Sequence, residues 1–73
     1  MDYAGVVVVV KIEVSQIDFL NKIMEGHEGY ALVSTIDPFQ GILHLNTSKT
    51  MLDDLLKILK DLPITIETLS IIA

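Results

Sequence analysis

Apolar residues alternate with polar residues, or run together, in four stretches of the chain, and both patterns are typical of β-strands. Residues 5–14, GVVVVVKIEV, begin as an unbroken apolar run and end in alternation, which predicts a central strand buried on both faces at its start. Residues 30–36 and 42–47 lie on either side of DPFQG, and residues 64–69, ITIETL, alternate cleanly. Because proline and glycine favour a turn in DPFQG, these stretches predict a β-hairpin and a separate last strand.

Two further stretches carry apolar residues at the three- and four-residue spacing of an amphipathic helix. They predict helices over residues 16–25 and 50–62, the second with a leucine-rich face. Side-chain oxygens favour the start of a helix, and glycine or proline favours its end. The expected N-caps are Ser15 for the first helix and Ser48 or Thr50 for the second, and the expected stops are Gly26 and Pro63. Gly26 and Gly41 are both expected to adopt a positive φ, which glycine tolerates without steric cost.

The predicted elements follow the order β-α-β-β-α-β within residues 1–73, with short connections and no room for a linker. This order is the ferredoxin-like plan, an α+β sandwich in which two helices cover one face of a four-stranded antiparallel sheet. We expect the strand order 4-1-3-2, because the long apolar first strand would be a liability at an edge. The chain is therefore predicted to form a single domain.

The length of the turn predicts which side chains share a face of the sheet. A five-residue turn from Asp37 to Gly41 sets Ile36 opposite Ile42, and alternation assigns the remaining positions. The face under the helices is expected to hold Val6, Val8, Val10, Ile12, Ala31, Val33, Leu43 and Leu45. The other face has no further element to cover it and is about half apolar. Its expected members are Tyr30, Leu32, Ser34, Ile36, Ile42, His44 and Asn46, with Val7, Val9, Lys11, Thr65, Glu67 and Leu69.

The composition indicates that a second chain covers part of this open face. Hydrophobic residues make up 51% of the 73 residues, the mean hydropathy is +0.55, and there is no cysteine for a disulfide. A chain this short has a thin margin of stability from its own core. We therefore expect a homo-oligomer, most simply a two-fold dimer, with edge-to-edge pairing of outer strands as the alternative. The expected interface residues are Val7, Val9, Leu32, Ile36, Ile42, His44 and Leu69.

The charge of the chain argues against polyanionic partners. The formal net charge is −5, and all five basic residues are lysines. Arginine is the usual residue for bidentate contacts to phosphate and guanine, and a negative field repels nucleic acid and anionic membrane. The run GVVVVV is far shorter than the roughly 20 residues of a membrane-spanning helix. It also follows no positively charged segment as a signal peptide would. We expect a cytoplasmic location and neither nucleic-acid nor membrane binding.

Two histidines are the candidates for chemistry. Glu25, His27 and Glu28 form an E-x-H-E cluster after the first predicted helix, and such side chains suit zinc, manganese or iron. Their spacing matches no helical metal-binding pair such as H-E-x-x-H, so we interpret the cluster as a solvated turn and expect no metal or cofactor. His44 lies in mid-strand on the open face and is interpreted as an interface residue rather than a catalytic one.

The chain also lacks the usual motifs of nucleophilic and phosphoryl-transfer enzymes. It has no cysteine, no G-x-S-x-G segment around its serines, and no phosphate-binding glycine motif. Asp53 and Lys57 are an i,i+4 pair on an ordinary solvated helix face. We therefore expect that the protein is not an enzyme.

The segment FLNKIMEGHEGYALVSTIDPFQGILHL resembles a family of short, uncharacterised bacterial proteins of unknown function. Members typically show an F-L-x-x-I-x-E-G-x-x-G pattern followed by a T-x-D-P-x-x-G turn and a return strand. The matching positions are Phe19, Leu20, Ile23, Glu25, Gly26, Gly29, Thr35, Asp37, Pro38 and Gly41. The resemblance covers nearly the whole chain and implies no activity.

At the level of fold, the plan is also similar to ACT domains, small regulatory modules that bind amino acids at subunit interfaces. Those domains usually place their ligand loop, rich in glycine or proline, between the first strand and the first helix. Here that junction is the tight, glycine-free VSQI of residues 14–17.

These observations lead to one expected function and one alternative. We expect a non-enzymatic, self-associating domain that regulates a partner or binds a small ligand. The alternative is a protein-interaction subunit that docks on a larger enzyme through its open sheet face.

Overall fold

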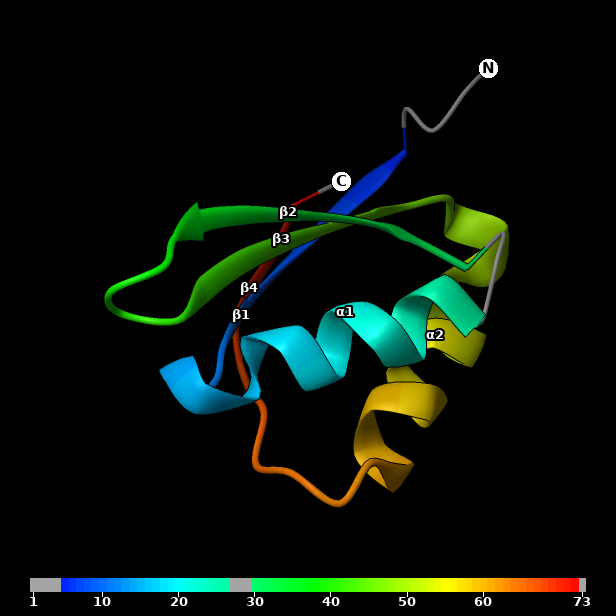
Figure 1. The fold of residues 1–73 in the computed structure, drawn as a ribbon. Coiled ribbons are helices and arrows are strands. Elements are labelled where there is room, and N and C mark those ends of the chain that lie inside the picture. The colour runs from blue at the N-terminus through cyan, green and yellow to red at the C-terminus, as the bar shows by residue number, and fades with distance from the viewer. Residues whose placement is uncertain (1–4, 27–29, 73) are drawn as a thin grey trace.

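The computed structural model describes residues 5–26 and 30–72 of the chain, and within them the elements follow the expected β-α-β-β-α-β order (Figure 1). A short 3₁₀ turn, η1, precedes the first helix. The elements are β1 (Val6–Lys11), η1 (Val14–Gln16), α1 (Ile17–Gly26), β2 (Leu32–Asp37), β3 (Ile42–Thr47), α2 (Lys49–Asp61) and β4 (Glu67–Ile72).

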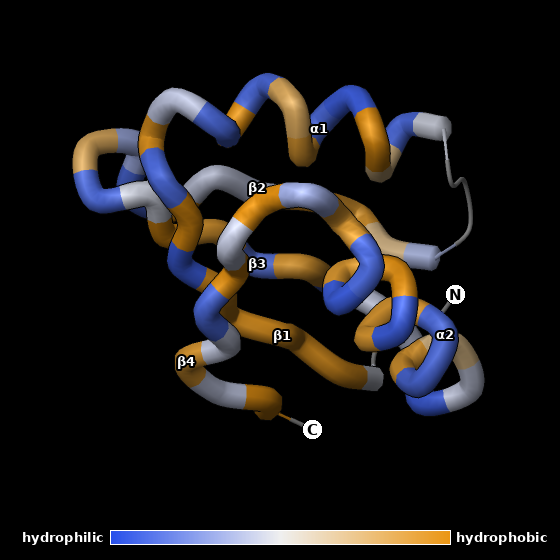
Figure 2. The backbone as a smooth tube through the Cα atoms, turned by 90° about the horizontal axis from the view of Figure 1, so that it is seen from below, coloured by the Kyte–Doolittle hydropathy of each residue, from blue (hydrophilic) through white to orange (hydrophobic). Residues whose placement is uncertain are grey.

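The four strands form one antiparallel sheet in the order β2-β3-β1-β4, which confirms the predicted 4-1-3-2 order read from the other edge. Both helices lie on the same side of this sheet (Figure 1). Apart from Lys11 at its end, β1 consists of valines (Figure 2) and occupies a central position, as expected for an unbroken apolar run that would be a liability at an edge. The α+β architecture is consistent with a ferredoxin-like arrangement.

The core lies between the sheet and the helices, and it follows the predicted alternation. In β1 and β3 every second side chain is buried, and these side chains pack against the apolar faces of α1 and α2. Burial of each such side chain stabilises the fold by about 1.5–3 kcal/mol relative to exposure. The buried hydrophobic residues are Val6, Val8, Val10, Ile12, Leu20, Met24, Leu43, Leu45, Leu55 and Leu59.

The start of α2 agrees with the sequence, and the start of α1 does not. Ser48 is the N-cap of α2, and its side chain accepts a hydrogen bond from the Met51 N–H at 3.2 Å. The predicted cap Ser15 is wrong, because Ser15 lies inside η1. There the Gln16 N–H donates to the Glu13 carbonyl oxygen at 2.8 Å. Such a 3₁₀ turn pairs backbone groups that a side-chain cap would otherwise satisfy.

The two glycines that were expected at positive φ behave differently. Gly41 has a φ of 73°, as predicted. Gly26 is the last residue of α1 and is not at positive φ, so that prediction is wrong. The helix still includes Gly26, and the chain therefore has no need of the left-handed conformation there.

The β2–β3 turn is one residue shorter than predicted. Leu32 to Thr35 pair with β3 in the expected register, but a β-bulge follows, and Asp37 rather than Ile36 is paired with Ile42. The turn is closed from within, since the Asp37 Oδ1 accepts the N–H groups of Phe39 and Gln40 at 3.0 and 3.2 Å. An aspartate that bonds its own following backbone in this way favours a tight turn, so the strand extends to Asp37.

The last strand is displaced along the chain from its predicted position. Residues 64–69 were expected to form it, whereas β4 is Glu67–Ile72. Residues 62–66 instead carry the chain from the end of α2 back to the edge of the sheet (Figure 1). This connection must cross the depth of the helix layer. Residues 64–66, the start of the alternating stretch, therefore belong to the connection and not to the strand. Thr65 therefore precedes β4 and does not belong to the open face, contrary to the prediction. The same prediction is wrong for Tyr30 for a separate reason, because Tyr30 precedes β2 and packs against the core.

Candidate interaction surface

The open face is the side of the sheet that faces away from the helices, and in the described residues nothing covers it (Figure 1). Cross-strand partners share a face, so the pairing registers order this surface into three rows. The apolar row is Leu32, Asn46, Val7 and Ile72; the middle row is Ser34, His44, Val9 and Ser70; the charged row is Asp37, Ile42, Lys11 and Glu67.

The apolar row has its most exposed side chains at the two edges of the sheet. Leu32 is 56% exposed at the β2 edge, and Ile72 is 54% exposed at the β4 edge. Between them Val7 is half-buried, and the Asn46 amide donates to the Leu32 carbonyl oxygen at 3.5 Å. That hydrogen bond directs the polar group of the row toward the β2 backbone, so the row offers mainly apolar contacts.

His44 lies in the middle row, on a central strand, between Ser34 and Val9. Its side chain is half-buried although no second layer of the described chain packs on it. The nearest charged positions belong to the charged row, where Lys11 is opposite both Ile42 and Glu67 in the registers. Polarity therefore increases across the open face, along a line parallel to the strands, from the apolar row through the middle row to the charged row.

Both edge strands contain a β-bulge, and each bulge carries an exposed aliphatic residue. Ile36, the extra residue in β2, is 53% exposed, and Leu69, the extra residue in β4, is 45% exposed. Both lie close to the Leu43–Val10 pair of the two central strands, at the same level along the strands. Ile36 is displaced from this pair toward Lys11, and Leu69 is displaced from it toward Val9.

The rows show where the predicted interface residues lie. Five of them occupy row positions, namely Val7, Val9, Leu32, Ile42 and His44, whereas Ile36 and Leu69 lie at the bulges. The predicted last strand ended at residue 69, so Ile72 was not placed on the open face or among the predicted interface residues. The apolar, β-branched pair Ile71 and Ile72 directly after the predicted strand was the available signal, although it does not reveal the bulge that brings Ile72 beside Val7.

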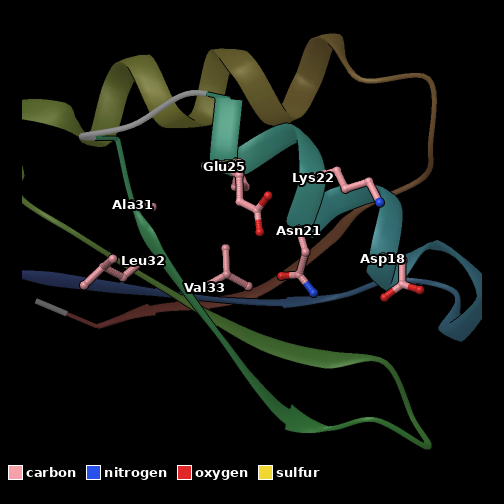
Figure 3. Close-up of a pocket in the computed structure, with 8 residues that line it drawn as sticks. Asp18, Asn21, Lys22, Glu25, Ala31, Leu32 and Val33 are labelled. Carbon is pink, nitrogen blue, oxygen red and sulfur yellow. The ribbon is translucent and has the colours of Figure 1, made fainter.

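A groove with a volume of about 940 Å³ lies between α1 and β2. One wall is polar and comes from α1, where Asn21 and Glu25 reach toward Val33 of β2 (Figure 3). Asp18, Lys22 and Glu25 lie on the same wall, at spacings of three and four residues. Residues three and four apart share a face of a helix, so the groove combines mixed charge with an aliphatic floor.

The predicted E-x-H-E cluster is only partly described. Glu25 lines the α1–β2 groove, whereas His27 and Glu28 lie outside the described residues. Within residues 5–26 and 30–72 there is no group of three or more histidine, aspartate or glutamate side chains arranged to hold a metal ion.

A second, shallower hollow of about 670 Å³ lies beside the β2–β3 turn and is lined by Phe39, Val14 and Glu67, among others. Phe39 is 90% exposed at the tip of the turn. In the part of the chain that the structure describes, no helix is long and apolar enough to span a membrane.

Comparison with known proteins gives a family and no activity. No curated protein and no solved structure matches the chain significantly. Residues 10–66, which include β1 from Val10 onward, both helices and the β2–β3 hairpin, match the model of a family described as a domain of unknown function, DUF4911. This match confirms the resemblance to a family of uncharacterised proteins. The chain belongs to the DUF4911 family.

Proposed function

We propose that the protein is a non-enzymatic, self-associating domain of ferredoxin-like fold, and that it forms a two-fold dimer through the open face of its sheet. The observation that carries this proposal is the apolar row, where Leu32 and Ile72 are more than half exposed on a face that no other described element covers. Exposed apolar patches of several hundred Å² on a small soluble protein are typical of interaction sites.

The size of the face supports a dimer. Four strands spaced about 4.8 Å apart, each of six residues at about 3.4 Å per residue, cover about 400 Å² in plan. Two such faces, with the relief of their side chains added, approach the roughly 1,000 Å² of total buried surface expected of a specific interface. In a two-fold dimer the same surface of both copies forms the interface, so one open face per chain is sufficient.

The bulges favour face-to-face pairing over edge-to-edge pairing. Both edge strands, β2 and β4, are interrupted by a bulge. A bulge twists the strand and breaks the regular row of hydrogen-bonding groups that an added strand would need, which is one way in which proteins protect sheet edges. The alternative dimer, an extension of the sheet, therefore has less support.

Regulation of a partner or binding of a small ligand is the finer form of the proposal. The α1–β2 groove offers a volume of ordinary ligand size. The junction between β1 and α1, where ACT domains usually place their ligand loop, is filled by η1, which disfavours that mode of binding. The second candidate function is docking of the same open face onto a larger enzyme, and it is favoured by the same exposed apolar row.

The test is the oligomeric state of charged variants. Val9→Glu places a carboxylate in the middle row, and Leu32→Glu does so in the apolar row, at a more exposed position where folding is less at risk. Burying an unpaired charge in an interface costs several kcal/mol, so either variant should be monomeric by multi-angle light scattering at tens of micromolar, where the unmodified protein is dimeric.

The control is Thr50→Glu, which adds the same charge at an exposed position on α2. It should remain dimeric, and circular dichroism should show all three variants folded. An unmodified protein that is monomeric at this concentration contradicts self-association and leaves docking on another protein as the interpretation. A dimer that persists in both face variants contradicts the open face as the interface.

A further inference from the structure

We infer that the two-fold axis of the dimer runs parallel to the strands, so that Leu32 of one copy packs against Ile72 of the second copy. This inference rests on the proposed self-association through the open face and adds the orientation of the partner. It follows from the way in which apolar and charged rows are ordered along the strands, because a two-fold axis decides which row meets which.

An axis that runs across the strands places each strand opposite the same strand of the second copy and reverses the order of the rows. The apolar row of one copy would then meet the charged row of the other, with Leu32 facing Asp37 and Ile72 facing Glu67. The aliphatic side chains of the apolar row would then face carboxylates instead of apolar partners, and they would lose the benefit of burial. This arrangement is the least favourable of the possible axes.

A diagonal axis gives the orthogonal type of sheet packing and satisfies only one corner of the face. If Leu32 lies on the axis and meets its own copy, Ile72 falls on Asp37. If Ile72 lies on the axis instead, Leu32 falls on Glu67. Either choice again places one of the two most exposed aliphatic corners of the apolar row against a carboxylate.

With an axis parallel to the strands, each row faces the same row of the second copy, and the β2 edge of one copy faces the β4 edge of the other. Leu32 at the β2 edge then meets Ile72 at the β4 edge, at both ends of the apolar row, and His44 faces Val9 in the middle row. The charged row meets itself at the rim, where Asp37 faces Glu67 of the second copy. Both carboxylates stay in contact with water there, and Lys11 is the cross-strand neighbour of Glu67 in each copy. The result is aligned face-to-face packing, which is a common arrangement of two twisted sheets.

The bulges point to the same axis by an independent route. Ile36 and Leu69 lie on opposite edges of the sheet and beside the same level, that of the Leu43–Val10 pair. An axis parallel to the strands exchanges the two edges and leaves the position along the strands unchanged, so it brings Ile36 of one copy near Leu69 of the other. Both side chains are about half exposed in the single chain, so this axis gives each a neighbour that it lacks.

Cross-linking between single-cysteine variants tests the orientation, because the chain has no cysteine of its own. Leu32→Cys, Ile72→Cys and Glu67→Cys are prepared separately, one member of each mixture is isotope-labelled, and a bismaleimide linker with a reach of about 10 Å, the spacing of stacked sheets, is added. Light scattering first establishes that each variant is a dimer. Cross-linked pairs are then identified by mass spectrometry.

We expect Leu32→Cys mixed with Ile72→Cys to give several-fold more cross-linked heterodimer than Ile72→Cys mixed with Glu67→Cys, or than either of the first two variants linked to itself. Dominant linkage of Ile72→Cys to Glu67→Cys establishes the axis across the strands. Dominant self-linkage of Leu32→Cys or Ile72→Cys establishes a diagonal axis. Dimers that yield none of these products also overturn the orientation, whereas a monomeric unmodified protein overturns the proposed function itself.

Discussion

Gly41 holds the β2–β3 hairpin against β1, and its replacement by alanine is the most informative single change in the turn. Its φ of 73° lies in the left-handed region, and its carbonyl oxygen accepts a hydrogen bond from the Ile12 N–H at 2.9 Å. A Cβ at this position would overlap the Ile12 carbonyl oxygen, which is rigid backbone. Gly41→Ala therefore forces the hairpin to move away from the start of the connection to α1.

The magnitude follows from two terms. Holding alanine in the left-handed region costs about 1–2 kcal/mol, and displacing the turn weakens the Ile12–Gly41 hydrogen bond, which costs about 0.5–1.5 kcal/mol more. The expected loss is about 1.5–3.5 kcal/mol. A chain of 73 residues has a free energy of unfolding of about 4–11 kcal/mol, so this single substitution removes a large fraction of it.

Urea unfolding followed by circular dichroism, at one fixed protein concentration, measures this loss. With a slope of about 1 kcal/mol per molar urea, the midpoint should fall by about 1.5 M or more. Gly26→Ala is the matched control, since Gly26 is at the helix end and is not at positive φ. Among the described residues, a Cβ added there would meet no atom of another element within 4 Å. Alanine at this position should leave stability unchanged or raise it by up to about 1 kcal/mol.

If Gly41→Ala lowers the free energy of unfolding by less than about 0.5 kcal/mol, Gly41 is not held at positive φ against the Ile12 carbonyl oxygen as described. If Gly26→Ala is equally damaging, the difference between the two glycines is not one of φ and backbone overlap.

Two further predictions concern hydrogen bonds that the structure assigns to single side chains. Ser48→Ala removes the N-cap of α2 and should cost about 1 kcal/mol in urea unfolding, whereas Thr50→Ala, the other cap that the sequence allowed, should change stability by less than half of that. Thr47 is 1% exposed, and its hydroxyl donates to the Tyr30 carbonyl oxygen at 2.5 Å. Thr47→Val keeps the shape and should cost about 1 kcal/mol, and a variant as stable as the parent would show that this hydrogen bond contributes nothing.

The sheet order and the buried face were predictable because both depend on the hydrophobic pattern. An unbroken valine run needs a neighbour on each side, which places β1 in the centre, and a short turn fixes the register of Leu32 to Thr35 against β3. Each conclusion uses interactions between residues that are close in sequence or whose burial is demanded by their own chemistry.

The bulges, the 3₁₀ turn and the start of β4 were not predictable for a common reason. Each depends either on local hydrogen bonds, such as those of Asp37 and Gln16, or on how far the chain must travel between layers, and alternation carries no information on either. Residues 64–66 alternate like a strand, yet they are needed to bring the chain from α2 to the sheet edge, so Ile72 rather than Leu69 lies beside Val7. The open-face positions of the two central strands were thus predicted correctly, and those of the edge strands only in part; their role as an interface stays a prediction.

β4 also affects the tendency of the chain to aggregate. It has no buried residue and pairs with β1 alone, and a strand with so few buried contacts opens at low free-energy cost. β1, which it covers, is six residues of high β-propensity with a single charge and neither proline nor glycine, the composition of segments that nucleate cross-β aggregates. The least anchored strand is therefore the one that keeps the most aggregation-prone strand from templating other chains. Packing of Ile72 against a second copy would slow this opening, so that dimerisation would also act as protection against fibril formation.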